Sequence, residues 1–458
     1  MALDCRQIHD YLALPLIPIV QEVGLRGIPI DIERQGILLM RLQGRIAALD
    51  IELERHGIFD PNSDAKLGWQ LRELGVPLSE RTESGKQFKV DAEVLGLKHW
   101  QWNTRRVATG RTARFPFLVP LLARAKLAKA RENIASLGVC NDGLLRTSLK
   151  ACHTKTARYA SSGFGRSTKP GFCPVCRTWG GHGTNLQNIS RGCSLCGSPP
   201  SKCACDGGGI HVKSLFTSWP GWRLGEWDYS ALELRVMAYR IQCRKLIERL
   251  EQGMDLHTIH AQIMFPSLDI TVRRRTLAKN FIYAIRGGGG DRAVFAVLAK
   301  QGEYVELSEI ASWRRAIFAE YPEIPSWIDE TAAVFQVQRD ANERRVLYNA
   351  FGRPRVFLGY EPLKEGLAYE ISSTAADIMN CVLLRIAYEQ PEVFEHIAMQ
   401  VHDSFLIHAP EADFPYVMGA VNKEMNRTVW NWDQAVVYPT EAKAGDRWSH
   451  LSAWQEAA

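Results

Sequence analysis

The stretch Arg275-Thr-Leu-Ala-Lys279-Asn-Phe-Ile-Tyr283, closed by Gly287-Gly-Gly-Gly290, is the part of the sequence to which the other motifs relate. Arg275, Lys279 and Tyr283 are spaced four apart, so on a helix they share one face. Two cations suit a polyphosphate, and an aromatic ring suits a nucleobase or a sugar. We interpret this face as a grip for a nucleoside triphosphate. The alternative is a solvated basic helix with a core tyrosine.

Two aspartates at the ends of predicted strands favour the first interpretation. Residues 219–228 are predicted to form a strand that ends at Asp228. Residues 397–409 alternate as in a hairpin, with His402 and Asp403 at its turn. Phosphoryl transfer with two metal ions needs two carboxylates on rigid elements, and strand ends provide such positions. For either aspartate alone, the alternative is a turn or cap residue.

Length and composition indicate a globular protein of several lobes. The chain has 458 residues, of which 46% are hydrophobic and 23% charged, and its formal net charge is +6. Local basic faces would suit a polyanion. No apolar run approaches the roughly 18 residues of a membrane span, and residues 1–20 lack the layout of a signal peptide. We expect a cytoplasmic protein without a membrane partner, in the bacterial host cytoplasm if a phage encodes it.

Secondary-structure signals predict a mixed α+β chain. Ser230 and Glu233 form an S-x-x-E capping box that would start a helix running to about residue 241. The remaining signals predict helices over 32–56, 66–74, from Pro120 onward, over most of 242–344 and over 365–390, and a hairpin over 345–358.

A cysteine-rich, polar segment lies within residues 163–207 and looks inserted. It holds three cysteine pairs: Cys173 with Cys176, Cys193 with Cys196, and Cys203 with Cys205. The first two pairs are separated by sixteen residues, which is zinc-ribbon spacing. The third pair could replace the first, or form a second site with His182. We expect one structural Zn²⁺ that folds this segment; the alternative is a set of free or buried thiols.

Several segments, in the same order along the chain, resemble motifs of the family A DNA polymerases, the DNA polymerase I family. They are the Arg275–Tyr283 stretch, Asp228-Tyr-Ser-Ala-Leu-Glu233-Leu-Arg235, Val401-His402-Asp403-Ser404, Met254-Asp-Leu-His257-Thr, Thr156-Ala-Arg158 with Asn185-Leu-Gln-Asn188, Tyr348-Asn-Ala-Phe-Gly352-Arg353, Ser373-Thr-Ala-Ala-Asp377 and Ala442-Lys-Ala-Gly-Asp-Arg-Trp448. The resemblance begins near residue 11 and covers almost the whole chain.

The resemblance implies the right-hand polymerase fold, with a thumb, a palm built on an antiparallel sheet, and helical fingers. It places the thumb and N-terminal support at 1–150, the palm at 151–240 and 345–458, and the fingers at 241–344. The segment 163–207 would be a zinc-binding insertion in the palm. Larger family members carry a proofreading exonuclease before this region, and we expect none here, as in stand-alone phage-type members.

The resemblance also implies roles for particular residues. Asp228 and Asp403, with the carbonyl of Tyr229, would hold two Mg²⁺ ions, and Lys279 would donate a proton to the leaving group. Glu233 would act as a steric gate against a ribose 2′-hydroxyl. The incoming nucleotide would be held by Arg275, Lys279, His257 and Tyr283. Primer and template would be contacted by Arg158, Gln187, Asn188, Arg353 and His402.

Four positions depart from the family pattern. Gly287 stands where a tyrosine is usual, so the finger helix should end early and lack a template-stacking ring. Ser404 replaces a glutamate, which leaves one fewer carboxylate beside the metals. Ala368 and Ser372 replace an asparagine and a glutamine that read the minor groove.

The implied activity is template-directed synthesis of DNA from dNTPs on a primer–template, in DNA replication. A processivity factor or a separate exonuclease would be further partners. One alternative is a reverse transcriptase or RNA polymerase on the same palm, and Glu233 argues against ribonucleotide substrates. The other is a degenerate DNA-binding paralogue, against which the two aspartates argue.

Overall fold

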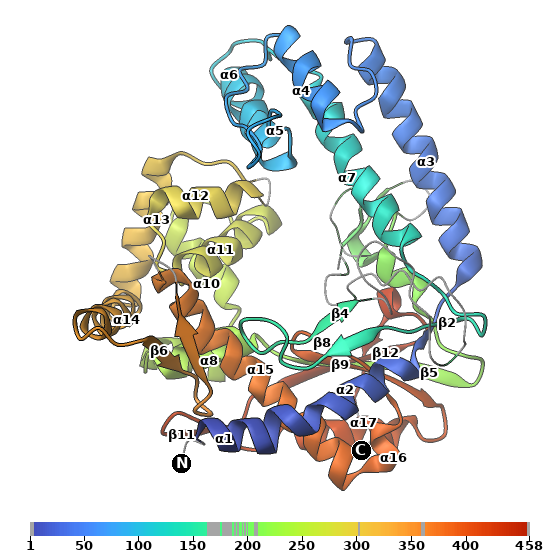
Figure 1. The fold of residues 1–458 in the computed structure, drawn as a ribbon, viewed down its shortest axis with the longest axis vertical. Coiled ribbons are helices and arrows are strands. Elements are labelled where there is room, and N and C mark those ends of the chain that lie inside the picture. Colours follow the sequence, from blue (N-terminus) through green and yellow to red (C-terminus); the bar gives the residue numbers. More distant parts are fainter. Residues whose placement is uncertain are drawn as a thin grey trace.

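A base and two helical arms make up the structure, a computed structural model that describes residues 4–162, 175, 186, 189, 192–194, 196, 198, 200–205, 209–300, 303–358 and 362–455. Figure 1 shows the arms rising from the base. We call residues 32–136 the first arm and residues 244–340 the second arm. No helix in these described ranges is long and apolar enough to cross a membrane.

The helices have the following bounds in the described residues. They are α1 (Cys5–Ile8), α2 (Leu14–Arg26), α3 (Ile32–Glu54), α4 (Asp64–Glu73), α5 (Ala92–His99), α6 (Arg105–Ala108), α7 (Leu118–Ala135), α8 (Leu232–Arg240), α9 (Arg244–Glu251), α10 (Leu256–Met264), α11 (Val272–Ile285), α12 (Asp291–Lys300), α13 (Leu307–Glu320), α14 (Glu323–Asp340), α15 (Leu363–Glu389), α16 (Pro391–Phe394) and α17 (Phe414–Met425). Short 3₁₀ or π-helical turns are η1 (His9–Ala13), η2 (Trp100–Thr104), η4 (Pro200–Lys202), η6 (Val212–Leu215) and η7 (Trp448–His450).

The strands are all short. They are β1 (Ile28–Pro29), β2 (Leu144–Leu145), β3 (Ser148–Lys150), β4 (Ala160–Ser162), β5 (Trp222–Tyr229), β6 (Arg345–Tyr348), β7 (Pro354–Phe357), β8 (Ile397–Val401), β9 (Ser404–Pro410), β10 (Val429–Asn431), β11 (Gln434–Val436), β12 (Thr440–Gly445) and β13 (Ser452–Ala453). Helices and an antiparallel sheet together confirm the expected α+β class.

The centre of the base is an antiparallel sheet with the strand order β13-β12-β5-β9-β8. Its side chains alternate between two cores. On one face Trp227 and Phe405 pack with α2, α15 and α17. On the other face Leu224 and Leu406 join a core that includes Leu38 of the first arm. Because both faces are covered, the strand ends at the edge near the arms are held rigidly.

The first arm is an antiparallel helix pair with a helical tip. Helix α3 begins at Asp31, whose carboxylate accepts a hydrogen bond of 2.9 Å from the backbone N–H of Arg34. Leu38, Leu42 and Ile46 recur every four residues and pack against α7. A separate core at the tip is formed by α4, α5 and the start of α7.

In the second arm, one face of α11 is turned into the arm and the other is turned toward the base. Leu277, Phe281 and Ile285 are buried, while Arg275 and Lys279 lie on the exposed side. The helix ends at Ile285, just before the glycine run, as the sequence predicted. The predicted hairpins are present as β6–β7 and β8–β9, and the helix predicted for 365–390 is α15.

Candidate active site

A cavity of about 720 Å³ lies between the sheet edge and the second arm. Ten of the predicted site residues line it: Arg158, Asp228, Tyr229, Glu233, His257, Arg275, Lys279, Tyr283, His402 and Asp403. They come from the loop before β4, from β5, α8, α10 and α11, and from the β8–β9 turn. Residues separated by up to about half of the chain therefore meet in one place. A second cavity, of about 700 Å³ beside β6, β7, β10 and β11, contains none of them.

The two aspartates lie on neighbouring strands at the same edge of the sheet. Asp228 pairs with Ser404 in the β5–β9 register, and the backbone N–H of Tyr229 donates to the carbonyl of Asp403 at 3.0 Å. His402 and Asp403 form the two-residue turn, with His402 in the left-handed region at φ 55°. The backbone hydrogen bond fixes the two acidic residues relative to each other, which a site for divalent cations requires.

Ser404 stands where the family pattern has a glutamate, so this position brings no carboxylate to the site. Ser404 is buried, and its hydroxyl donates to the carbonyl of Val401 at 3.0 Å. Glu441 of β12, however, stands opposite Asp228 in the register and lines the same cavity. No sequence motif marks Glu441, because its position depends on pairing between strands more than 200 residues apart.

Arg275 is paired in this structure with an acidic residue of α10. Its Nε and Nη2 atoms donate to the Asp255 carboxylate at 2.6 and 2.9 Å. Asp255 also caps α10, where it accepts from the backbone N–H of His257 at 3.1 Å. The hydrogen bonds from Arg275 lower the pKa of Asp255. An anion that binds Arg275 must therefore compete with Asp255.

His257 lies next to these cations and is held neutral. Burial lowers its pKa to about 4, and Lys279 and Arg275 add to the effect. Its Nδ1 atom is buried and has no hydrogen-bond partner among the described residues. A neutral imidazole beside two cations can donate a hydrogen bond to an anion without adding charge.

Glu233 accepts hydrogen bonds from three residues of other segments. One carboxylate oxygen accepts from Arg158 and, at 2.7 Å, from the hydroxyl of Ser372, and the other accepts from Arg286 at 2.5 Å. Burial would raise the pKa of Glu233, but Arg286 and Arg158 outweigh it and lower the pKa to about 2. Arg286 also lies 4.5 Å above the ring centre of Tyr283.

The capping-box prediction for Glu233 is wrong. Helix α8 begins at Leu232, its N-cap is Ala231 in the left-handed region at φ 53°, and no side chain caps it. The glutamate is instead bound by Arg158, Arg286 and Ser372. Ser372, a departure from the family pattern, is thus a partner of Glu233, and Arg286 was missed by sequence reasoning.

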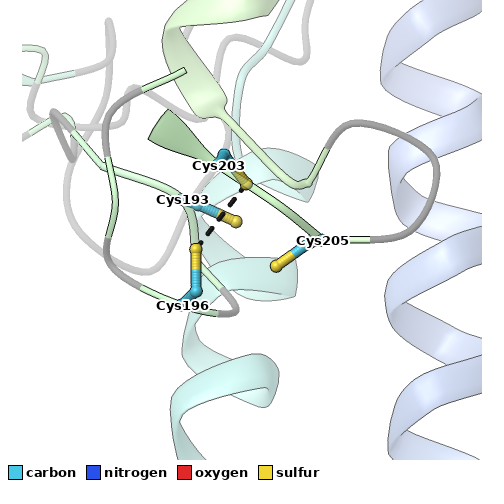
Figure 2. A group of neighbouring side chains, drawn as sticks. All are labelled: Cys193, Cys196, Cys203 and Cys205. Atoms are coloured by element: carbon cyan, nitrogen blue, oxygen red, sulfur yellow. Dashed lines mark hydrogen bonds between the residues drawn. The ribbon is translucent and has the colours of Figure 1, made fainter. Parts of the chain in front are cut away.

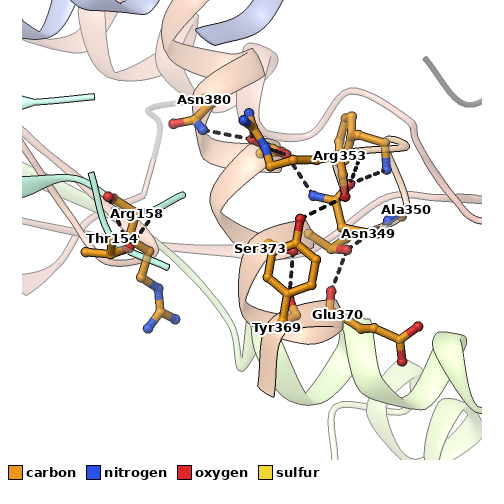
Figure 3. A network of polar contacts seen from close by, with 12 residues as sticks. Thr154, Arg158, Asn349, Ala350, Arg353, Tyr369, Glu370, Ser373 and Asn380 are labelled. Carbon is orange, nitrogen blue, oxygen red and sulfur yellow. Dashed lines mark hydrogen bonds and ion pairs between the residues drawn. The ribbon is translucent and has the colours of Figure 1, made fainter. Parts of the chain in front are cut away.

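Arg353 lies away from the cavity, in a buried network (Figure 3). Its Nε and Nη2 atoms each donate at 2.8 Å to the carboxylate of Asp377, which is fully buried in α15. Asn349 and Asn380 donate to the same carboxylate at 2.7 and 3.0 Å. This network ties the β6–β7 hairpin to α15.

Four cysteines of the inserted segment converge beside the root of the first arm (Figure 2). The thiols of Cys193, Cys196, Cys203 and Cys205 all lie within 4.8 Å of one another. The backbone N–H of Ile210 donates to the sulfur of Cys193 at 3.2 Å. Gly209, at φ 73°, leaves no room for a side chain, since a Cβ there would lie 2.5 Å from the sulfur of Cys203.

Four of the predicted site residues fall outside the described residues, and so does one alternative ligand. These are Cys173, Cys176, Gln187 and Asn188, together with His182. Of the ligand combinations left open by the sequence, the structure brings together the second and third cysteine pairs.

The fold and the cavity define the class of this protein: a polymerase-type architecture, in which two helical arms flank an antiparallel sheet that carries two aspartates at its edge. A solved structure supports the class. The polymerase domain of Pol1 from M. smegmatis, in complex with a DNA primer-template and dNTP, superposes with a TM-score of 0.73 at 20% identity, over 97% of this chain and 71% of that one.

The chain belongs to DNA polymerase family A, whose sequence profile matches residues 181–450. Similar proteins include the thermostable DNA polymerase I of Thermus caldophilus, 24% identical over 95% of this chain, and the DNA polymerase I of Caldicellulosiruptor bescii, 25% identical over 97%. The chain spans about half the length of these relatives, 47% in each case.

Proposed function

We propose that this protein is a template-directed DNA polymerase that adds dNTPs to the 3′ end of a primer, in DNA replication. The observation that carries the proposal is the shared cavity, where two aspartates on a rigid sheet edge face the cationic side of α11. Anionic phosphates and divalent cations would complement these two sides.

The proposed lobes follow from the two arms. Residues 1–150 would supply the thumb and N-terminal support, residues 241–344 the fingers, and residues 151–240 with 345–458 the palm. The cysteine segment 163–207 would be an insertion in the palm. Primer–template DNA would lie between the arms and above the sheet.

Two Mg²⁺ ions are the proposed cofactors of the reaction. Asp228 and Asp403 fit them, because carboxylate oxygens are preferred ligands of Mg²⁺ and the backbone bond between β5 and the β8–β9 turn fixes both residues. The carbonyl of Tyr229 would be a further ligand. When bound, such ions activate the primer hydroxyl and neutralise charge on the leaving pyrophosphate.

The residues of the second arm would hold the incoming nucleotide. Arg275, Lys279 and His257 would bind the triphosphate, with Lys279 as the proton donor to pyrophosphate. Tyr283 would pack on the sugar and base. Glu233 would occupy the space of a ribose 2′-hydroxyl, and its ion pairs would hold it there.

Primer and template would be contacted from the base. Arg158, His402, Gln187 and Asn188 are the proposed contacts. Arg353 would act indirectly, because its guanidinium is committed to Asp377 and supports the β6–β7 hairpin. These 458 residues are proposed to lack proofreading, and incubation with a mispaired primer in the absence of dNTPs tests this: shortening of the primer would contradict it.

Primer extension on four substrate combinations tests the activity. The purified protein and Mg²⁺ are offered dNTPs or NTPs on a primed DNA or RNA template. We expect extension with dNTPs on DNA. Extension mainly with NTPs, or mainly on RNA, would identify one of the two related enzymes instead, and duplex binding without extension would identify a degenerate paralogue.

We also propose that Cys193, Cys196, Cys203 and Cys205 hold one structural Zn²⁺. Zinc–sulfur bonds of about 2.3 Å place the four sulfurs of a tetrahedral site about 3.8 Å apart, close to the observed cluster. The thiols of Cys196 and Cys203 are 3.6 Å apart. The N–H donor at Cys193 would stabilise a thiolate.

Metal analysis tests the zinc proposal. Protein purified without chelator should contain about one zinc per chain, and Cys203→Ser should lower that content. Cys243→Ser is the matched control. Cys243 is buried in the core that contains Trp227 and Phe405, and it lies outside the cysteine cluster. Zinc-free wild-type protein, or equal zinc in both variants, would contradict the proposed ligands.

A further inference from the structure

The tips of the two arms touch each other through aromatic rings. Trp100, in η2 of the first arm, lies parallel to Tyr304 of the second arm, with ring centres 6.1 Å apart and an angle of 20°. Its ring also meets Phe295 of α12 at 5.9 Å. Figure 1 shows α5 directly above α12 at this point. Stacked and tilted pairs at these distances are attractive.

Gly96 of α5 makes this approach close. A Cβ atom at this position would lie 1.8 Å from the hydroxyl oxygen of Tyr304 and 3.0 Å from the adjacent ring carbon. Tyr304 therefore inserts into a notch on α5 that exists only because residue 96 has no side chain. Burial in this notch raises the pKa of Tyr304.

An ion pair beside the rings joins the same two tips. Nε of Arg105 lies 3.2 Å from a carboxylate oxygen of Glu306. The Arg105 guanidinium also lies 5.8 Å from the ring centre of Trp100, so it contacts the aromatic group of its own arm. The contact thus combines shape, aromatic packing and opposite charge.

The tip contact completes a closed path of contacts around the candidate site. From the base the path runs through α3 and α7 to α5, crosses to α12, and returns through α11 and α10 to the cavity with Asp228 and Asp403. We propose that the arms form a clamp that closes over bound duplex DNA and retains it through successive additions, so that processivity is built into this chain. This inference rests on the proposed polymerase function.

A closed path changes how a duplex can leave. With separated arms, DNA can depart sideways as soon as its phosphate contacts break. With joined arms it must slide out along its axis, or wait until the tips part. Because the contact consists of a few rings and one exposed ion pair, it can open to admit DNA.

Charge reversal at the tips tests the clamp. Protein is bound to labelled primer–template, and extension is started together with an excess of unlabelled primer–template, so that product length reports one binding event. Arg105→Glu and Glu306→Arg should each shorten the products severalfold. The double variant should restore them, since it re-forms the pair in reverse. Lys66→Glu is the matched control, because Lys66 pairs within the first arm.

The rate of the first nucleotide addition shows whether a variant changes the chemical step or only the retention of DNA. We expect all four variants to add one nucleotide at the wild-type rate. Unchanged product length in both single variants, or no recovery in the double variant, would overturn the clamp.

If the wild-type protein adds no nucleotide, the polymerase proposal fails, and small-angle scattering then tests the contact. Expansion by Arg105→Glu but not by the double variant would support the contact, and no expansion would refute it.

Discussion

Arg286 links the nucleotide side of the cavity to the proposed sugar gate. It stands at the C-cap of α11, donates to Glu233 and lies over the ring of Tyr283. Glu233 has a pKa of about 2, so it stays ionised at neutral pH and keeps both arginines. The position of the proposed gate is therefore set by two arginines and one hydroxyl group from three other segments.

Removing Arg286 should weaken discrimination against ribonucleotides. Arg286→Leu deletes one hydrogen bond to a charged group, worth about 1.5 kcal/mol, so we expect the dNTP-over-NTP ratio of kcat/KM to fall about tenfold. Glu233→Ala should lower it at least as much. Arg292→Leu, an exposed arginine at the start of α12, is the control. An unchanged ratio in Arg286→Leu would show that the ion pair between Arg286 and Glu233 does not contribute to sugar selection.

Asp255, which pairs with Arg275, would compete with the proposed triphosphate for its guanidinium. Asp255→Asn removes the opposing charge but keeps an oxygen that caps α10. We expect the KM for dNTP to fall severalfold with kcat unchanged, because Arg275 would no longer have to break its ion pair with residue 255 to bind the triphosphate. Steady-state kinetics on a single-nucleotide gap measure both constants, and Asp269→Asn in the loop before α11 serves as control. A rise in KM would show that Asp255 orients Arg275 toward the nucleotide.

Among the elements, α10 contains a buried histidine that makes the stability of the protein depend on pH. His260 of α10 is buried against Tyr321, with ring centres 5.6 Å apart. Burial, together with His257 and Arg249, lowers its pKa from 6.5 to about 3. The folded state thus binds fewer protons than the unfolded state below pH 6.5, and stability falls as pH decreases toward about 3.

His260→Phe should flatten this loss of stability. Urea unfolding at pH 7, 6 and 5 gives the free energy of unfolding at each pH, and the variant should lose less of it on acidification than the wild type. His153→Phe, at an exposed position, should follow the wild-type slope. Equal dependence of the unfolding free energy on pH in all three proteins would show that His260 does not cause the loss of stability.

Elements with local signals could be predicted from the sequence. The β8–β9 hairpin around His402 and Asp403 follows from two short β-forming runs, and the end of α11 follows from the glycine run behind it. The capping box failed because a short motif cannot show that arginines 75 residues before and 53 residues after Glu233 will bind it. The pairing of Arg353 with Asp377 and the place of Glu441 beside Asp228 likewise depend on tertiary packing.

In the whole molecule, the sheet and the second arm line the cavity, while the cysteine cluster lies beside the root of the first arm. The sheet fixes the aspartates, the second arm turns its cations toward them, and the first arm reaches across to the second. The core on one face of the sheet also includes the root of the first arm and Ile210, next to the cysteine cluster. Loss of zinc would therefore affect the base of the proposed thumb before it affected nucleotide binding.

Asp228 and Asp403 are proposed to carry Mg²⁺-dependent nucleotide addition together, and single-turnover addition of one dNTP to a primed DNA template measures their contribution. Asp228→Asn and Asp403→Asn should each reduce the rate by at least about a thousandfold, as expected when a preorganised charge is lost from a reaction centre. Both variants should bind the primer–template as the wild type does, and Asp433→Asn, an exposed turn residue, should retain the full rate. Addition at near wild-type rate by either aspartate variant would contradict the account.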